Sequence, residues 1–186
     1  MNIEPDKQPL NNINHYDERE LPEIREMELA DLEPVYLLGE RLFPADKWPS
    51  LYRTWDEYEL ANLFVSDGEL CFVAEDDNSV IGFAMGTLIE KRRSAWTYAH
   101  LLWLGVDPAY RGSGVAKRLL DQFTETCIEE GARMMMVDTA SENTGALRFF
   151  EGQGFGKAEQ HVYLSRNLTG LPQYRRKRRR PTSRGE

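Results

Sequence analysis

One segment of this chain constrains its fold more than any other. An apolar run, residues 101–106, leads through a short turn into a loop, residues 111–114, and then into an amphipathic stretch that begins at Val115. The run predicts a strand and the amphipathic stretch a helix, so the loop joins the end of a strand to the start of a helix. Gly112 and Gly114 carry no Cβ, so successive N–H groups can converge on one point, which also faces the positive end of the helix dipole. With a planar arginine cation at its start, the loop predicts a phosphate-binding site.

The other apolar patterns alternate between strand and helix spacing, which is typical of an α/β domain. A hairpin turn is expected at residues 76–79, and Thr54 is the candidate cap of the second helix. The strand at 98–106 is apolar on both faces and is expected in the middle of the sheet. The expected strands are Glu23–Met27, Leu70–Glu75, Val80–Ile89, Tyr98–Val106, Met134–Asp138 and, approximately, Gln160–Ser165; the expected helices are Asp31–Phe43, Asp56–Ser66, Val115 to Gly131 and Asn143–Gly152.

The net charge of −8 conceals two oppositely charged parts. Residues 1–170 carry 30 acidic and 16 basic side chains, a net of −14, whereas residues 171–186 carry seven basic side chains and one acidic, a net of +6. Such a basic run is too poor in apolar residues to pack. We therefore expect a flexible segment at 1–20, one folded domain at 21–168 and a disordered basic tail at 169–186. The tail can contact a ribosome or nucleic acid through phosphates, or simply stay solvated.

Composition narrows the class of protein. Hydrophobic residues at 41% suffice for a core, and no apolar run approaches the roughly 18 residues of a membrane helix. The first 20 residues do not have the pattern of a secretory signal. Cys71 and Cys127 both lie within apolar patterns, which predicts neither a disulfide framework nor a metal site. We expect a cytoplasmic protein without membrane contact.

Two stretches resemble a known family. Residues 111–116, Arg-Gly-Ser-Gly-Val-Ala, match the pattern of Arg or Gln, any two residues, Gly, any residue, and Gly or Ala. Residues 143–155, Asn-Thr-Gly-Ala-Leu-Arg-Phe-Phe-Glu-Gly-Gln-Gly-Phe, resemble a second conserved block of the same family. Both resemble the GNAT superfamily of acetyl-coenzyme A dependent N-acetyltransferases, and so does the element order from about Leu21 to Leu168. The resemblance implies a mixed α/β (α+β) sheet of six to seven strands, splayed at strand 4 and flanked by about four helices.

The resemblance also implies how acetyl-CoA, the expected co-substrate, is held. Backbone N–H groups of the loop grip the pyrophosphate, and the edge of the fourth strand pairs with the pantetheine arm like an added strand. Asn143 hydrogen-bonds the arm in this interpretation, whereas without a ligand it is a helix cap. Gly105 is the position at which we expect a bulge that splays the strand. The residues assigned to the cofactor are Leu104, Gly105, Val106, Arg111, Gly112, Ser113, Gly114, Val115, Ala116, Asn143, Ala146 and Phe149.

The implied activity is direct attack of a primary amine on the thioester in a ternary complex. A backbone N–H near Leu104 is the expected donor to the thioester carbonyl. His100 resembles the catalytic histidine of the arylalkylamine branch, and an imidazole accepts protons near neutral pH, so it is the candidate general base. The alternative is a core histidine bonded to a backbone carbonyl. Tyr98 and His100 share a face with Leu102, Leu104 and Val106 unless a bulge intervenes.

The general acid is unknown, because Phe150 stands where many relatives have tyrosine. Tyr163, Tyr98, Ser141 or a water are alternative donors, or the thiolate leaves without one. This departure keeps a second class of function open, a non-catalytic sensor of acyl-CoA. A third, a nucleic-acid or ribosome-associated module, depends on the basic tail. A phosphate-binding NTPase is disfavoured because no Lys-Ser or Lys-Thr pair follows the loop.

The acceptor is expected to be an amine or a peptide. A strongly acidic body suits a basic acceptor, such as a protein N-terminus, a lysine side chain, a polyamine or an arylalkylamine. We expect a monomer or a homodimer. For each candidate residue of the acceptor site, an ordinary core or surface role is the alternative. The candidates are Trp48, Tyr52, Trp55, Tyr58 and Tyr98 for the walls, and Glu57 or Glu59 for attracting a cation.

Overall fold

The computed structural model describes residues 21–44, 54–90, 96–156, 158–159, 162, 164 and 166–174. The chain divides into two compact units, Met1–Pro49 with Trp55–Asp138 and Ser50–Thr54 with Thr139–Glu186, and each is considered by itself. The expected flexible segment at 1–20, three candidate residues and most of the basic tail lie outside the described residues. The three candidates are Trp48, Tyr52 and Tyr163, and the part of the tail concerned is 175–186.

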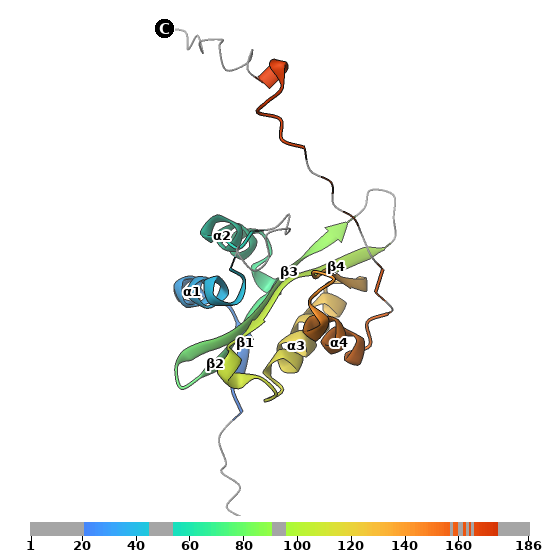
Figure 1. Ribbon diagram of the computed structural model, residues 1–186. Coiled ribbons are helices and arrows are strands. Elements are labelled where there is room, and N and C mark those ends of the chain that lie inside the picture. The colour runs from blue at the N-terminus through green and yellow to red at the C-terminus, as the bar shows by residue number, and fades with distance from the viewer. Residues whose placement is uncertain are drawn as a thin grey trace, which may run out of the picture. The chain divides into compact units, whose positions relative to one another are not determined.

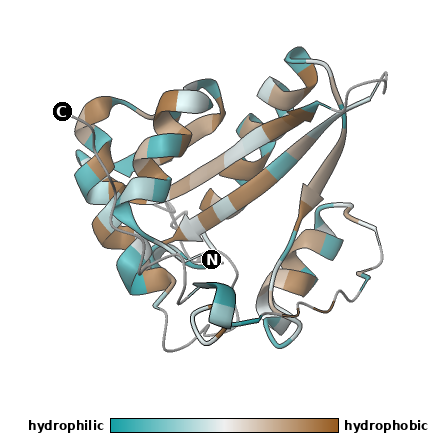
Figure 2. Ribbon diagram, turned by 90° about the horizontal axis from the view of Figure 1, so that it is seen from above, coloured by the Kyte–Doolittle hydropathy of each residue, from teal (hydrophilic) through white to brown (hydrophobic). Residues whose placement is uncertain are grey.

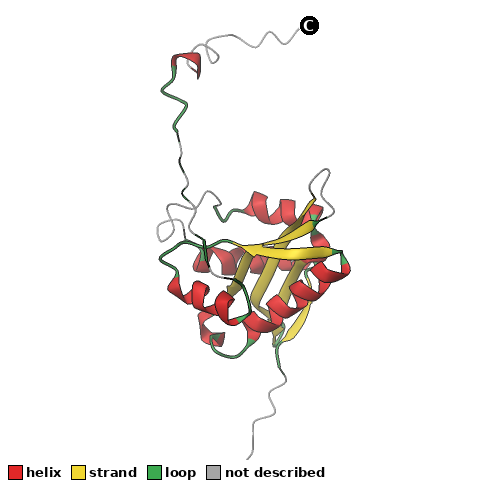
Figure 3. Ribbon diagram, turned by 90° about the vertical axis from the view of Figure 1, so that its right-hand side faces the viewer, coloured by secondary structure: helices red, strands yellow, loops and turns green. Residues whose placement is uncertain are grey.

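Five strands of the first unit form one mixed sheet in the order β1-β2-β3-β4-β5 (Figures 1 and 3). The first four strands pair antiparallel with their neighbours, and β4 pairs parallel with β5. The described residues therefore form five strands rather than six to seven, because the expected strand near 160–165 falls mostly outside them. The strands are β1 Glu23–Glu26, β2 Cys71–Asp76, β3 Ser79–Glu90, β4 Thr97–Val106 and β5 Ala132–Val137.

The β2–β3 hairpin has the turn that its sequence predicts. Asp76 pairs with Ser79, and the two residues between them, Asp77 and Asn78, have φ of 47° and 57°. Two consecutive left-handed residues make the tight turn whose twist matches that of the strands, and Asp and Asn tolerate this conformation.

Four α-helices of the described residues are close to the expected ranges. They are α1 Leu32–Leu42, α2 Glu57–Ser66, α3 Val115–Glu129 and α4 Thr144–Gly152, with short 3-10 turns at Leu29–Asp31, Gly68–Leu70 and Pro108–Tyr110. The expected cap Thr54 is wrong: Asp56 caps α2, because its carboxylate accepts from the N–H groups of Tyr58 and Glu59 at 2.9 and 2.8 Å. None of the helices in the described ranges is long and apolar enough to cross a membrane.

The sheet of the first unit is covered on both faces. α1 and α2 lie on one face and α3 on the other (Figure 1), with hydrophobic residues along the strands between them (Figure 2). On the first face Trp55, Trp103, Phe43 and Phe83 form an aromatic cluster with ring centroids 4.9–6.2 Å apart. On the second, the buried side of α3 packs against small residues of β3. Its fully buried side chains are Val115, Leu119, Phe123 and Cys127.

A bulge interrupts the pairing of β4 with β3. Met85 pairs with Trp103, but the next residue, Gly86, pairs with Leu101, so Leu102 is an additional residue of β4. A Cβ on Gly86 would lie 2.5 Å from the Phe123 ring on α3, and only glycine fits there. One inserted residue reverses the alternation of side chains between the two faces of a strand.

The bulge changes which residues share a face with His100. Thr87, which pairs with His100, lies two residues beyond Met85 on the continuous strand β3 and so on the face of α1 and α2. Tyr98 and His100 therefore share the face of Trp103. The expectation that they face the same way as Leu104 was limited to a strand without a bulge, and the bulge at Leu102 places them on the opposite face.

The bulge also lies three residues before its expected position. Gly105 belongs to the regular ladder, opposite Phe83. Steric contact, not a bulge, accounts for glycine at this position: a Cβ there would lie 2.7 Å from the Leu42 side chain and 3.1 Å from the Phe83 ring. Close packing of α1 on β4 therefore excludes a side chain at this position.

Candidate functional site

The loop between β4 and α3 has an exposed, open backbone at a helix start. Gly112 and Gly114 have φ of 78° and 86°, and a Cβ on either would meet nothing within 4 Å. Gly114 is the N-cap of α3 and offers no side chain to its first turn, which also carries no acidic residue. The N–H groups of Val115 and the following residues therefore face open space at the positive end of a fifteen-residue helix. This geometry suits an anion such as a phosphate.

Side chains on both sides brace this loop. The Asp107 carboxylate accepts from the N–H of Ala109 at 2.9 Å and from the Arg41 guanidinium of α1 at 3.0 Å. The Tyr110 hydroxyl donates to Asp76, at the β2–β3 turn, at 2.7 Å, and this bond raises the pKa of the Tyr110 phenol. These contacts hold residues 107–110, the first part of the loop, in this conformation without a ligand.

The edge of β4 that faces β5 opens next to the loop. The Asp107 N–H donates to Ile81 on the β3 side, and alternate residues of a strand direct their N–H groups to the same edge. The N–H of Leu104 therefore points to the β5 side. The β4–β5 ladder, however, ends where Leu101 pairs with Val137. Leu104 thus lies beyond the end of this ladder, because β5 ends at Val137 whereas β4 continues to Val106. The expected splay of the sheet at this strand stays a prediction.

His100 lies near the end of that ladder and contacts a carboxylate. Its Nε2 is 2.8 Å from Oδ1 of Asp138, the residue that follows β5, and the two side chains are 19% and 32% exposed. Parallel pairing produces the contact, because His100 is in register with Met136, two residues before Asp138. The sequence interpretation missed Asp138, although a carboxylate directly after a parallel neighbour of the histidine strand is a signal that can be read.

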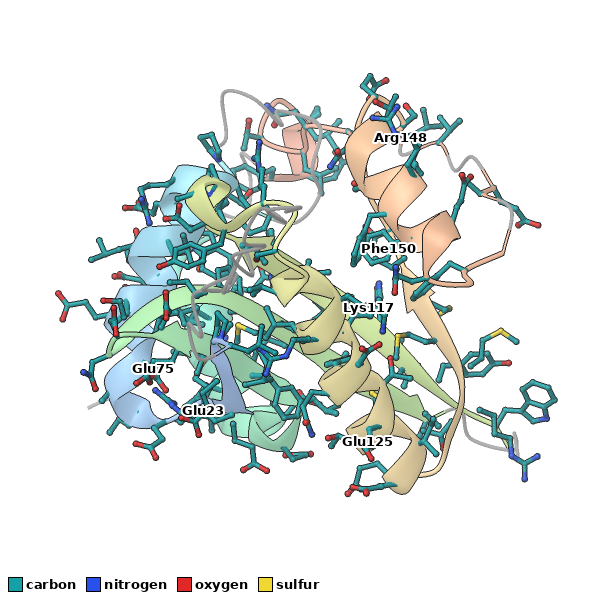
Figure 4. All side chains as sticks on the ribbon, turned by 90° about the horizontal axis from the view of Figure 1, so that it is seen from below. Glu23, Glu75, Lys117, Glu125, Arg148 and Phe150 are labelled. Carbon is teal, nitrogen blue, oxygen red and sulfur yellow. The ribbon has the colours of Figure 1, made fainter. Side chains whose placement is uncertain are left out.

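The second unit contains the other motif. Asn143 caps α4: its side-chain oxygen accepts from the N–H of Ala146 and its amide donates to Thr139, both at 3.2 Å. Phe150 on α4 (Figure 4) is buried, with ring centroids 5.2 Å from both Phe149 and Phe155. The helix-cap role of Asn143 is thus observed, and its contact with a cofactor stays a prediction.

The candidate acceptor residues have different surroundings. Trp55 is buried in the aromatic cluster, and its indole donates to the backbone oxygen of Tyr36 at 3.0 Å, so core packing accounts for it. Glu59 accepts from the Trp103 indole at 3.2 Å, whereas Tyr58 is 74% exposed. Tyr98 is half-buried on the face of His100. Whether any of them contacts an acceptor stays a prediction.

Comparison with known proteins gives a consistent result. Residues 39–155 match the family model of the acetyltransferase (GNAT) family. An acetyltransferase of Yersinia pestis (strain Pestoides F) is 30% identical over 148 residues, which are 78% of this chain and 95% of that protein.

Solved structures share the fold. The structure of AAC(6')-Iy in complex with the bisubstrate analogue CoA-S-monomethyl-acetylneamine has a TM-score of 0.63 and 24% identity, over 78% of this chain and 97% of the other. Ard1 from Thermoplasma volcanium has a TM-score of 0.60 and 26% identity, over 75% of this chain and 85% of the other. In all three comparisons the matched region includes most of the described residues.

Proposed function

This chain belongs to the acetyltransferase (GNAT) family, and on that premise we propose that it transfers the acetyl group of acetyl-CoA to a primary amine. The observation that carries the proposal is the start of α3, where two left-handed glycines, one of them the helix cap, expose N–H groups next to the part of β4 that lies beyond the β4–β5 ladder. A phosphate-binding helix start beside an accepting strand edge suits a ligand with a pyrophosphate and an amide-rich arm.

Two parts of the first unit hold acetyl-CoA in this proposal. The N–H groups of Arg111 and Ser113 donate to Pro108 and Tyr110 within the loop, both at 3.3 Å, so the N–H groups of Gly112 and of residues 114–116 bind the pyrophosphate. The Arg111 side chain adds a cation at the exposed rim. The edge at Leu104 and Val106 hydrogen-bonds the pantetheine arm. Because the loop is already braced by Asp107, binding does not require it to reorganise.

The reaction needs a neutral amine and a stabilised oxyanion. His100 removes a proton from the ammonium form of the acceptor, directly or through a water. The amine nitrogen then forms a bond to the thioester carbon, and the negative charge on the carbonyl oxygen is met by the N–H of Leu104. The carbon–sulfur bond breaks as the intermediate collapses, CoA leaves as the thiolate, and the second amine proton goes to solvent or to the sulfur. The products are an amide and CoA.

The acceptor is proposed to be a cationic amine. Residues 1–170 carry a net charge of −14, which concentrates cations near the surface. The relative AAC(6')-Iy was solved with an analogue that joins CoA to acetylneamine, an aminoglycoside fragment. Aminoglycosides, polyamines and the N-termini of peptides all meet this description.

A thiol-release assay tests the proposal. Acetyl-CoA is offered with each of five acceptors: kanamycin, spermidine, tryptamine, a peptide with a free N-terminus, and an N-terminally blocked peptide that contains lysine. At least one is expected to release CoA well above the rate without acceptor. His100→Gln is expected to lower kcat/KM by roughly 10²-fold and to flatten the acidic side of the pH profile. Glu125→Gln, which removes an exposed charge on α3 (Figure 4), serves as the matched control and leaves both unchanged.

A second function is favoured by one observation. Phe150 has no proton to give to the departing thiolate and is buried among other phenylalanines. If the protein binds acetyl-CoA but releases no thiol with any of the five acceptors, the non-catalytic acyl-CoA sensor becomes the better account of its function.

For the proposed enzyme, an unchanged pH profile of kcat/KM in His100→Gln removes His100 from the mechanism.

A further inference from the structure

We propose that Asp138 is a positioning residue that holds His100 in one tautomer, with Nδ1 as the nitrogen that accepts the proton. The inference rests on the proposed acetyl transfer and adds to it a residue that acts through the general base. It starts from the contact of 2.8 Å between Nε2 of His100 and Oδ1 of Asp138.

The chemistry of the two groups decides which nitrogen carries the proton. An ionised carboxylate can only accept hydrogen bonds, so a neutral imidazole at this distance must donate from Nε2. Its other nitrogen, Nδ1, then carries the lone pair. A carboxylate in this position also stabilises the imidazolium that forms when the proton arrives.

The backbone holds the pair in place. His100 is inside β4, and Asp138 follows β5 directly, where parallel pairing ends one residue beyond His100, at Leu101 and Val137. The backbone of His100 is therefore held inside a strand, and that of Asp138 is one residue beyond the last paired residue of the neighbouring strand, which limits how far the two side chains can move apart. The pair also lies at the end of the β4–β5 ladder, and His100 is on the same strand as the Leu104 N–H.

Other charged groups near the ring act less directly. Thr87 pairs with His100 across the β3–β4 ladder, and its hydroxyl donates to the Asp67 carboxylate at 2.7 Å. A second carboxylate is therefore linked to the neighbour of His100 rather than to the imidazole ring. On β4 itself the nearest titratable side chain on the same face is Tyr98. Of the two carboxylates, Asp138 contacts the ring and Asp67 contacts Thr87. Asp67 therefore provides a matched control that removes one negative charge without touching the imidazole.

The proton moves in one defined step. The acceptor ammonium loses a proton to Nδ1 as its lone pair becomes free to attack the thioester carbon. The imidazolium then carries protons on both nitrogens, and Asp138 keeps accepting from Nε2. Release of the Nδ1 proton to water regenerates the starting tautomer after the amide has left.

Nitrogen NMR of histidine-labelled protein tests the tautomer without any acceptor. The chain has three histidines, His15, His100 and His161, and His100→Gln identifies the signals of the ring. At pH 8.5 the wild type is expected to show the Nε2–H tautomer. In Asp138→Asn the amide can donate to Nε2, so the ring is expected to shift toward the Nδ1–H form. A wild-type ring with its proton on Nδ1, or one that does not change in Asp138→Asn, overturns the proposal.

Kinetics test whether the tautomer matters for the reaction, with the fastest of the five panel amines as acceptor. Asp138→Asn is expected to lower kcat by roughly tenfold to hundredfold, which is no more than the loss expected when the base itself is removed, with KM for acetyl-CoA changed less than about twofold. The double variant with His100→Gln is expected to be no slower than His100→Gln alone, because Asp138 acts through the ring. Asp67→Asn is expected to stay within twofold of the wild type.

These readouts separate the two proposals. If His100→Gln keeps full activity while the NMR shows the predicted tautomers, the role of His100 as base and the proton transfer to Nδ1 both fail, and only the tautomer set by Asp138 stands. If the two losses in kcat multiply in the double variant, Asp138 does not act through His100 and its positioning role is refuted. A loss of equal size in Asp67→Asn also refutes it, since the effect then follows from charge alone.

Discussion

The strongest prediction compares two glycines with the same backbone strain, Gly114 and Gly131. They have φ of 86° and 82°, and a Cβ on either would meet nothing within 4 Å. Gly114 starts α3 at the proposed phosphate site, whereas Gly131 follows the other end of the same helix. The variants Gly114→Ala and Gly131→Ala therefore introduce equal strain, and only the first puts a methyl group into the space proposed for the anion.

The expected sizes follow from the geometry. A side chain in the left-handed region costs about 1–2 kcal/mol, which lowers Tm by roughly 2–8 °C in a chain of this length. Both variants should show this loss. Displacing one charge-assisted hydrogen bond to the pyrophosphate costs about 1.5–3 kcal/mol, roughly tenfold to hundredfold in the Kd for CoA, and only Gly114→Ala should show that.

Two measurements on each variant decide the matter. Thermal unfolding without ligand gives Tm, and calorimetric titration with CoA, which has no acetyl group to transfer, gives Kd. Equal Kd values for the two variants would refute the assignment of the helix start as the phosphate site. A Tm loss confined to one variant would refute the strain argument.

Three further predictions concern stability, reactivity and turnover. Asp31→Asn should lower the free energy of unfolding by about 1–3 kcal/mol at pH 7, since Asp31 is buried and bonded by Arg25. The Arg25 hydrogen bond holds the pKa of Asp31 below its ordinary value, so this stabilisation is present above about pH 4 and is lost at lower pH. Urea unfolding should therefore show a smaller difference in the free energy of unfolding between wild type and Asp31→Asn at pH 3 than at pH 7. A difference that stays constant between the two pH values contradicts the prediction. Burial raises the pKa of both Cys71 and Cys127 to about 12, so an aromatic disulfide reagent at pH 8 should label them only in urea, and labelling of the native protein contradicts this. Phe150→Tyr should raise kcat for thiol release by adding a phenolic proton donor, whereas an unchanged kcat would mean that another donor already serves.

Some of the acidic residues that give residues 1–170 their negative charge are paired with an arginine within the fold. Glu75 on β2 lies opposite Glu23 on β1 (Figure 4), and Arg25 donates to Glu75 as well as to Asp31. One guanidinium thus donates hydrogen bonds to two carboxylates from different elements. These bonds link β1 both to β2 and to the turn before α1.

Much of the fold could be predicted because its signals are local. The period of α3, the two turn residues Asp77 and Asn78, and the glycines of the loop each act within a few residues of sequence. The cap of α2 is one local signal that the sequence does not locate correctly: the helix begins at Glu57, so Asp56 rather than Thr54 is at the N-cap position.

What could not be predicted depends on contacts between strands. The bulge at Leu102 lies opposite Gly86 on β3, which packs against Phe123 of α3, and no pattern within β4 reveals this arrangement. It moves His100 to the other face of the sheet from Leu104. The contact of His100 with Asp138 likewise requires the parallel register of two strands 38 residues apart in sequence.

The central claim is that backbone amides at the start of α3 bind the pyrophosphate of CoA, and an amide NMR titration of the full chain with CoA tests it most directly. The largest shifts are expected at the N–H signals of residues 111–117, followed by those of Leu104 and Val106. If CoA leaves these signals unchanged, or moves only signals elsewhere, the claim is contradicted.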